Sequence, residues 1–358
     1  MQNIGVIFGG PSGEYEVSCN SAEAICANLN REKYNIIPIG MGKNGKMYAP
    51  VEMGDIKTFN PACYEQKEVN LLAKPGGELR DNNGQLVAKL DAVIPIVHGT
   101  CGEDGVLQGL LELAKVPYVG AGVCGSAVGM DKILMRKILA FHQIPQTKYV
   151  CTTRNEIEKD IEDVVKKASE ELKYPIFIKP ANAGSSVGIT KADNEEKLRE
   201  GLAEAAKFDR RILLEEGINA REIEISVMGN DEPICACAGE IIASNEFYDY
   251  KAKYIDNKSI AVIPAEITTE EYEKIVAWAR EAYQALDCAG LGRLDFFIDK
   301  NNGQIYFNEI NTLPGFTEIS MYAKLWAESG INFSELLDKL LEYAFERFED
   351  KKRNVIDF

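Results

Sequence analysis

Four polar residues near the end of the chain have the types and the spacing of a divalent-cation site. Arg293 and Asp295 stand at the start of one apolar run, Glu309 and Asn311 follow a second, and the turn-forming stretch 300–303 separates the two. The pattern predicts an antiparallel hairpin in which Arg293 shares a face with Asp295, and Glu309 shares a face with Asn311. Carboxylate and amide oxygens are the ligands that Mg²⁺ prefers. The hairpin therefore predicts a magnesium site of Asp295, Glu309 and Asn311 beside the cation of Arg293.

A glycine- and serine-rich loop follows another predicted strand. The strand ends at Lys179, and the loop Gly184-Ser185-Ser186-Val187-Gly188 comes shortly after it. Backbone N–H groups on such a frame suit a nucleotide phosphate. The lysine precedes the glycines, whereas in a Walker A sequence it follows them, so a P-loop NTPase is disfavoured. By itself the loop is typical of an ordinary turn, and it is the metal hairpin that favours a phosphate role.

Several charged residues have an ordinary structural interpretation when each is taken alone. Lys132 is typical of a solvated charge on a helix face. Glu14 stands at the start of a predicted helix, where the helix dipole favours an anion. Glu215 and Glu222 suit either surface charges or acceptors for the hydroxyl and amino groups of a nucleotide. His98 ends an apolar strand, so it is either structural or, because ligands bind at the carboxyl ends of parallel strands, functional.

The elements that must position these residues begin with alternating strands and helices. Apolar strands are predicted at 4–8, 35–39 and 92–97, and the periodicity of 105–114 predicts a helix. This order predicts a small parallel α/β domain, with the turn-rich stretch 74–84 as a looser peripheral part.

The rest of the chain divides at two glycine-containing stretches. Gly120-Ala121-Gly122 marks a boundary, and Gly217-Ile218-Asn219-Ala220 indicates a hinge between two lobes. The expected units are an N-terminal α/β domain at 1–120, a central lobe at 121–215, and a C-terminal lobe at 216–358 that carries the metal hairpin. In the C-terminal lobe, aromatic and charged residues alternate at 247–254, which suits either an edge strand or a lid loop that closes over a substrate.

Composition argues against several classes of protein. The chain has 358 residues, of which 46% are hydrophobic, and a formal net charge of −16. Such an acidic chain has little affinity for nucleic acid or an anionic membrane surface. Nine cysteines without CxxC spacing suit reduced thiols. With no apolar run as long as a membrane span and no basic leader, a cytoplasmic location is expected.

Taken together, the motifs resemble those of the D-alanine–D-alanine ligase family, in order and spacing over nearly the whole chain. The resemblance implies an α/β protein with an ATP-grasp fold of three domains. The N-terminal domain is Rossmann-like, the other two are α+β lobes, and ATP lies between the central and C-terminal lobes. The matching segments are Gly9-Gly10, Ser12, Glu14 and Val17-Ser18; His98-Gly99 and Gly102-Glu103-Asp104-Gly105; Met130-Asp131-Lys132; Lys179-Pro180 and the loop 184–188; Tyr248-Asp249-Tyr250 and Lys253-Tyr254; and Asn308-Glu309, Asn311-Thr312 and Pro314-Gly315.

The resemblance also implies a reaction. Two D-alanines are joined to D-alanyl-D-alanine, a peptidoglycan precursor, through an acyl phosphate made from ATP. It implies two Mg²⁺ or Mn²⁺ ions on Asp295, Glu309 and Asn311, and a homodimer. The implied catalytic groups are Glu14, Ser185, Tyr254, Arg293 and the N–H of Gly315. The implied ATP contacts are Lys132, Lys179, Ser185, Ser186, Glu215, Glu222, Lys253 and Asn308. The implied substrate contacts are Glu14, Val17, Ser18, His98, Ser320 and Met321.

Two alternatives stay open at this point. Tyr15 stands where many of these ligases have histidine, in a form similar to that of some D-alanine–D-serine ligases, so a serine-adding enzyme is the first alternative. Met321 resembles the residue of the D-alanine enzymes and favours D-alanine as the second substrate. The second alternative is a non-catalytic ATP-binding protein that has kept the fold.

Overall fold

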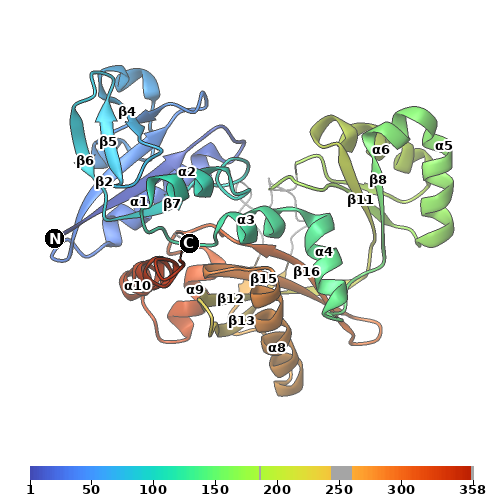
Figure 1. The fold of residues 1–358 in the computed structure, drawn as a ribbon. Coiled ribbons are helices and arrows are strands. Elements are labelled where there is room, and N and C mark those ends of the chain that lie inside the picture. Colours follow the sequence, from blue (N-terminus) through green and yellow to red (C-terminus); the bar gives the residue numbers. More distant parts are fainter. Residues whose placement is uncertain (185–186, 243–259, 356–358) are drawn as a thin grey trace.

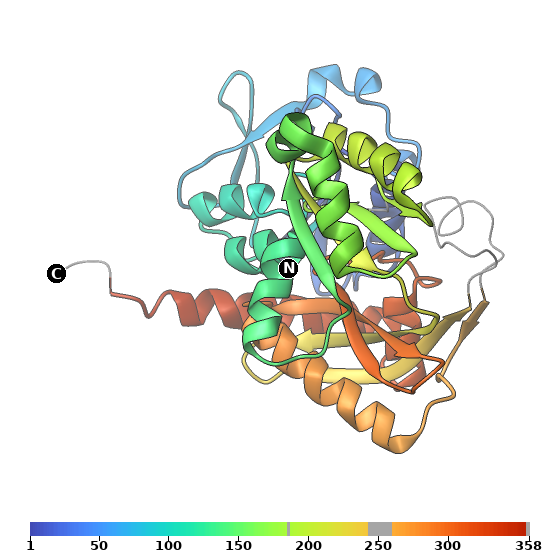
Figure 2. The ribbon, with the colours of Figure 1, turned by 90° about the vertical axis from the view of Figure 1, so that its right-hand side faces the viewer.

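Three β-sheets organise the molecule. The computed structural model describes residues 1–184, 187–242 and 260–355, whose strands form sheets of seven, four and five strands (Figure 1). Both views place helix α8 (Thr269–Ala285) on the side of the third sheet that faces away from the other two sheets (Figures 1 and 2). Of the helices in these ranges, none combines the length and apolar composition that a membrane span requires.

The first sheet lies at the N-terminus and has the strand order β6-β5-β4-β3-β2-β1-β7. Strand β1 pairs in parallel with β2 and β7, as the alternation of strands and helices predicts, and helices α1 and α2 belong to this unit. The bounds are β1 (Gln2–Gly9), α1 (Tyr15–Asn28), β2 (Tyr34–Met41), β3 (Met47–Tyr48), three short 3₁₀ turns (Met53–Asp55, Pro61–Cys63, Glu65–Lys67), β4 (Glu68–Leu71), β5 (Glu78–Asp81), β6 (Leu86–Lys89), β7 (Ala92–Ile96) and α2 (Val106–Ala114).

The prediction of a parallel α/β domain is confirmed for β2, β1 and β7, but the prediction of a loose peripheral stretch is wrong. Strands β3 to β6 extend the sheet antiparallel, so the stretch 74–84 supplies hairpin turns rather than a loose periphery. Val69, Leu71 and Leu79 are buried while most of their neighbours are partly exposed, a burial pattern typical of antiparallel strands with one solvated face. Each of these strands is short, and the turn residues between them dominate the sequence pattern.

The second sheet is antiparallel, in the order β10-β9-β11-β8, and two helices cover it. Its elements are β8 (Tyr149–Thr153), α5 (Arg154–Glu171), β9 (Ile176–Pro180), β10 (Thr190–Ala192), α6 (Glu195–Phe208) and β11 (Arg211–Glu216). Thr153 caps α5 in a reciprocal capping box with Glu156. Ile178, Leu202 and Leu214 belong to the apolar core between the sheet and these helices.

The third sheet carries the predicted metal hairpin and has the order β14-β13-β12-β15-β16. The hairpin prediction is confirmed, because β15 and β16 pair antiparallel with Arg293 opposite Asn311 and Asp295 opposite Glu309. The elements are β12 (Ala220–Gly229), β13 (Ile234–Ile242), β14 (Ile260–Val262), α8, β15 (Gly290–Asp299), β16 (Ile305–Asn311), α9 (Met321–Glu328) and α10 (Phe333–Lys351). Helices α8 and α10 each begin with a reciprocal capping box, formed by Thr268 with Glu271 and by Asn332 with Glu335.

Two short helices connect the units. They are α3 (Val123–Met130) and α4 (Lys132–Phe141), which we expected in the central lobe. Met135 and Leu139 of α4 join the apolar core of the third sheet, while Ile133 packs with Ala181 and Leu213 of the second. The segment therefore bridges both sheets, and it places Lys132 at their junction.

Candidate functional site

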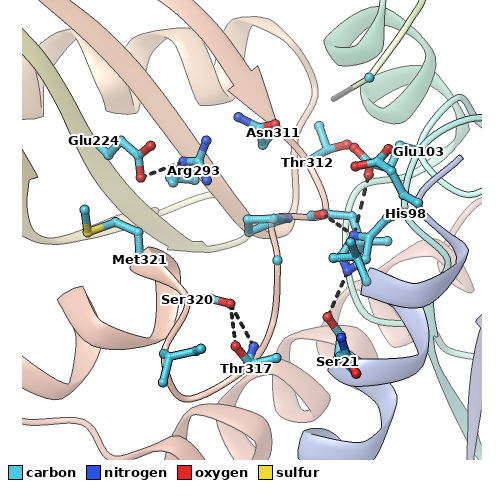
Figure 3. A pocket seen from close by; sticks show the side chains of 18 of the residues that line it. Ser21, His98, Glu103, Glu224, Arg293, Asn311, Thr312, Thr317, Ser320 and Met321 are labelled. Atoms are coloured by element: carbon cyan, nitrogen blue, oxygen red, sulfur yellow. Dashed lines mark hydrogen bonds and ion pairs between the residues drawn. The ribbon is translucent and has the colours of Figure 1, made fainter. Parts of the chain in front are cut away.

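A cavity of about 1030 Å³ lies where the three units meet. Its wall is formed by α1, the segments that follow β7 and β9, the C-terminal end of α3, the β15–β16 hairpin, and the segment that leads into α9. Figure 3 shows His98 and Glu103 on the right, Arg293 and Asn311 across from them, Met321 on the left beneath Glu224, and Ser320 lower down. The predicted site residues in the wall are Glu14, Val17, His98, Lys132, Arg293, Glu309, Asn311, Gly315, Ser320 and Met321.

Other predicted residues lie behind this wall or outside the described ranges. Asp295 is bonded to Arg293 without lining the cavity, and the partly buried Lys179 is paired with the buried Glu215. Glu222 and Asn308 lie on β12 and β16 without lining it. Ser185, Ser186 and the stretch 247–254, which contains Lys253 and Tyr254, lie outside the described residues.

The carboxylates of the third sheet gather around Asp295. Ligand oxygens of Glu222, Glu224 and Asp295 lie within 4.8 Å of one another, and Glu309 is the cross-strand partner of Asp295. The Asn311 amide donates to Asp295 Oδ2 at 3.1 Å. The atoms that these side chains could offer to a metal ion are all oxygens, so the set fits a hard cation such as Mg²⁺. Glu224 is an addition that the sequence analysis missed, although its spacing from Glu222 signals a shared strand face.

Arg293 is held by the two carboxylates on either side of it. Its Nε lies 3.1 Å from Glu224 and donates to Asp295 Oδ1 at 2.8 Å, while Nη2 donates to Asp295 Oδ2 at 2.7 Å. Burial alone lowers the pKa of Arg293, but the charges of Asp295 and Glu224 outweigh it and raise the pKa well above its ordinary value. The cavity therefore contains a cation that is fixed in orientation and stays charged.

Lys132 is not a solvated helix-face charge. Its side chain is only 12% exposed, and Nζ lies 3.8 Å from Glu309. The ammonium also donates to the carbonyl of Ala183 at 3.0 Å. It thus lies between the metal hairpin and the segment that enters the glycine-serine loop, where it suits a bound phosphate.

Glu215 is likewise not a surface charge. It is 3% exposed, lies 2.5 Å from Lys179 Nζ, and accepts hydrogen bonds from Arg136 and Thr147. Burial alone would raise the pKa of Glu215, but the charges of Arg136 and Lys179 outweigh this effect and lower the pKa to about 2. Sequence reasoning missed Arg136, a buried arginine on α4, because nothing local distinguishes it from a surface charge.

Glu14 is the N-cap residue of α1, but its side chain makes no capping hydrogen bond to this helix, all of which is described. It is buried, and an added Cβ at Gly99 or Gly184 would lie 2.5 or 2.9 Å from its Oε2. These two glycines therefore leave space for the carboxylate, which lies where the first and second units approach each other. The capping interpretation is wrong for the side chain.

The structure does not bring Ser18 into the cavity. Its hydroxyl accepts from the N–H of Gly9 at 2.8 Å and donates to the carbonyl of Ile96, and the residue is fully buried. Ser18 therefore ties the ends of β1 and β7 to α1, which positions its neighbours in the wall, such as Val17, instead of contacting a substrate itself.

Ser320 and Met321 form the floor at the start of α9. Ser320 is the N-cap residue of that helix, and its Oγ lies 2.8 Å from Thr317 Oγ1 and accepts from the Thr317 N–H at 3.1 Å. Gly315, from the same segment, reaches the wall beside them. A hydroxyl at a helix N-terminus suits a carboxylate ligand.

Comparison with known proteins identifies relatives over the whole length. A family model described as the D-ala D-ala ligase N-terminus matches residues 3–121, and one for the C-terminus matches 138–342. The D-alanine–D-alanine ligase of Ruminiclostridium cellulolyticum is 48% identical, with 99% of each chain covered. That of Acetivibrio thermocellus is 46% identical, with 96% of each chain covered.

Solved structures agree with this. The D-alanine–D-alanine ligase from Coxiella burnetii superposes with a TM-score of 0.86 at 32% identity, covering 99% of this chain and 98% of that one. VanG D-Ala:D-Ser ligase from Enterococcus faecalis superposes with a TM-score of 0.86 at 37% identity, covering 96% of this chain and 99% of that one. The expected α/β ATP-grasp architecture is thereby confirmed, and the chain belongs to the D-alanine–D-alanine ligase family.

Proposed function

We propose that this chain joins two D-alanines to D-alanyl-D-alanine at the expense of ATP, as a step in making peptidoglycan precursors. The observation that carries the proposal is a single cavity that combines three kinds of group. It has the carboxylate of Glu14 for an ammonium, the fixed cation of Arg293 with the N–H of Gly315 for an oxyanion, and Ser320 for a second carboxylate. A ligase that condenses two amino acids needs all three.

The reaction then proceeds in two displacements. The carboxylate of the first D-alanine attacks the γ-phosphorus of ATP and releases ADP, which leaves an acyl phosphate. The amine of the second D-alanine attacks the acyl carbon, and phosphate leaves as the amide bond forms and the amine loses its proton. Glu14 holds the first ammonium in place, and Arg293 with Gly315 stabilises the oxyanion of the tetrahedral intermediate. Removing such a donor typically costs about two to three orders of magnitude in rate.

The residues that would hold the metal ions are Asp295, Glu309 and Asn311, and their all-oxygen donor set supports that role. When bound, Mg²⁺ would neutralise charge on the phosphates during transfer. Lys132 and Lys179 would contact the phosphates, and Glu215 and Glu222 the adenine and ribose. Glu215 also keeps Lys179 in place through the contact described above. The proposed roles of Ser185, Ser186, Lys253 and Tyr254 concern residues outside the described ranges.

A second candidate is ligation of D-alanine to D-serine. The similarity to VanG D-Ala:D-Ser ligase favours it, since that protein covers nearly the same length. Against it, the cavity wall contains the apolar side chain of Met321, next to Ser320 in the chain, and those of Ile241 and Ala261. An apolar surface suits the methyl group of D-alanine better than the hydroxyl of D-serine, which would lose its hydrogen bonds to water.

The test is to incubate the protein with Mg·ATP and D-alanine, with and without competing D-serine, and to identify the product by mass. D-alanyl-D-alanine formed with an equal amount of phosphate supports the proposal. A dominant D-alanyl-D-serine product would move the chain to the second candidate. If no dipeptide forms with either amino acid, the protein is not a ligase of this kind.

The Ser320→Ala variant should weaken binding of the second amino acid. Losing a hydrogen bond to a charged carboxylate costs about 1.5 kcal/mol or more, so KM for the acceptor should rise by about tenfold or more. KM for ATP should stay within about twofold, because ATP binds elsewhere in the cavity. If steady-state kinetics showed a changed affinity for ATP and an unchanged KM for the acceptor, the assignment of Ser320 to the acceptor site would be wrong.

The Gly239→Ala variant should narrow the acceptor side of the cavity. Gly239 lies on β13, and an added Cβ would lie 2.9 Å from the sulfur of Met321 and 2.9 Å from Leu325 Cδ2. Both are flexible chain ends, so Met321 should move toward the cavity and raise the acceptor KM several-fold. Gly109→Ala is the matched control, because an added Cβ there meets nothing within 4 Å. Equal kinetics in both variants would contradict the role given to Met321.

We also propose a cytoplasmic location, where the precursor substrates are found, and a homodimer, on the strength of the family resemblance. Sedimentation or light scattering of the purified protein would test the dimer.

A further inference from the structure

A ring of hydrogen bonds joins the N-terminal unit to the segment that carries Gly315. His98 Nδ1 lies 3.0 Å from the carbonyl oxygen of Leu313, and His98 Nε2 lies 3.0 Å from Ser21 Oγ. Ser21 Oγ in turn accepts from the N–H of Phe316 at 3.3 Å. Figure 3 shows His98 and Ser21 facing each other beside this segment. The two contacts to the segment therefore fall on either side of Pro314 and Gly315.

The chemistry of the partners sets the direction of the bond to Leu313. A carbonyl oxygen only accepts, so Nδ1 of His98 carries a proton and donates it to Leu313. In the neutral ring Nε2 then accepts from the Ser21 hydroxyl. Burial lowers the pKa of His98, but Glu103, whose Oε1 lies 3.7 Å from Nδ1, raises it above its ordinary value, and in the charged ring Nε2 donates to Ser21 Oγ instead. The contact between His98 and Ser21 is kept in both states. Ser21 keeps a lone pair free for the Phe316 N–H. Each polar atom in the ring thus has a suitable partner, which is what a buried network requires.

Both side chains are buried, and the segment is anchored by its apolar side chains as well. Ser21 is fully buried and His98 is 2% exposed. Leu313 and Phe316 belong to the apolar core that also contains Ile25 of α1. Packing therefore holds the side chains of the segment, while Ser21 and His98 hold its backbone. Gly315 has no side chain to be held, so the orientation of its N–H depends on these flanking contacts.

We propose that Ser21 and His98 are positioning residues that aim the backbone N–H of Gly315 at the oxyanion. The inference rests on the proposed ligase function, because it gives two residues that line the cavity the task of holding a group that acts on the substrate. It also explains why helix α1 of one unit is connected to a backbone segment of another. Rate is sensitive to such placement, since a displacement of about 1 Å can cost about a hundredfold.

The test uses Ser21→Ala, which opens the ring without adding bulk. We expect kcat for dipeptide formation to fall by about tenfold or more, with KM for ATP within about twofold of wild type. Ser21→Thr keeps the hydroxyl and should restore most of the rate. Ser126→Ala is the matched control, because Ser126 is equally buried and donates to one backbone carbonyl, that of Ala121 at 3.2 Å.

An unchanged kcat in Ser21→Ala would overturn the proposal, and so would an equal loss of kcat in Ser126→Ala. A fall in ATP affinity that matches the fall in kcat would also overturn it, since it would indicate general damage to the fold. Failure of the ligase function itself looks different, because the wild-type protein would then make no dipeptide. If Ser21→Ala does not fold, Ser21→Cys, whose thiol is a weak donor and acceptor, should show the same selective loss of kcat.

Discussion

Replacing Glu309 by glutamine should reduce kcat by at least about a hundredfold while leaving the protein folded. The change removes one negative charge from the proposed metal ligands and keeps the size of the side chain. It also removes the carboxylate that lies 3.8 Å from Lys132. The Mg²⁺ concentration needed for half-maximal activity should rise as well. Phosphate release measured across a Mg²⁺ titration checks both effects.

The melting temperature of this variant should change little. Glu309 pairs across the strands with Asp295, whose ligand oxygens lie near those of Glu222 and Glu224. The change removes the repulsion between Glu309 and Asp295 together with the attraction between Glu309 and Lys132, so the two effects on the free energy of unfolding offset each other. Asp299→Asn, at the far end of the same hairpin, is the control and should keep wild-type kinetics. Wild-type activity in Glu309→Gln would overturn the assignment of the metal ligands.

Replacing Arg136 by methionine should cause the largest loss of stability. Arg136 is 1% exposed and is ion-paired with Glu215, so the change leaves a buried carboxylate with fewer partners. Breaking a buried pair in this way costs on the order of 3 kcal/mol. Because Glu215 also holds Lys179, KM for ATP should rise too. Chemical denaturation and steady-state kinetics measure the two effects.

The control for this variant is Arg199→Met. Arg199 donates to both carboxylate oxygens of Glu162 at 2.7 Å, but both side chains are exposed. Solvent-exposed ion pairs contribute little to the free energy of unfolding, so the melting temperature should hardly change. Equal losses of stability in the two variants would show that burial does not matter at Arg136.

The same network predicts a pH dependence of stability. The pKa of Glu215 is about 2 in the folded protein, below its ordinary value of 4.5, because Arg136 and Lys179 outweigh the effect of burial. A lowered pKa means that the ionised carboxylate stabilises the fold above pH 4.5, and that this contribution is lost as the pH falls toward 2. The stability difference between wild type and Glu215→Gln should therefore shrink over that window.

The parts of the site that the sequence predicts are those governed by local rules. The two apolar runs, the short turn and the two-residue period predict the antiparallel pairing and the shared faces of Arg293 with Asp295 and of Glu309 with Asn311. A register shift between Asp295 and Phe296, which these rules do not predict, then places Asp295 opposite Glu309. The family-level fold follows from the order of many short motifs. Neither depends on knowing which distant segments touch.

The parts that the sequence does not predict depend on long-range contacts. Glu224 supports Arg293 from a neighbouring strand, and Arg136 meets Glu215 across 79 positions. Lys132 and Glu14 each have an ordinary local explanation, and only the meeting of separate units shows that the explanation does not apply. Burial of a charged side chain is a property of the assembled molecule, so no local pattern reveals it.

The cavity has one further consequence, because its wall is shared among all three units. A molecule that fills it contacts each unit, so part of its binding free energy resists their separation. By mass action, a ligand present at about a hundred times its Kd stabilises the state that binds it by about 2.7 kcal/mol. Bound substrates therefore stabilise the arrangement of the three units as well as react. The units should be held together most firmly during turnover, and an inhibitor that contacts the same walls should make the whole chain more rigid.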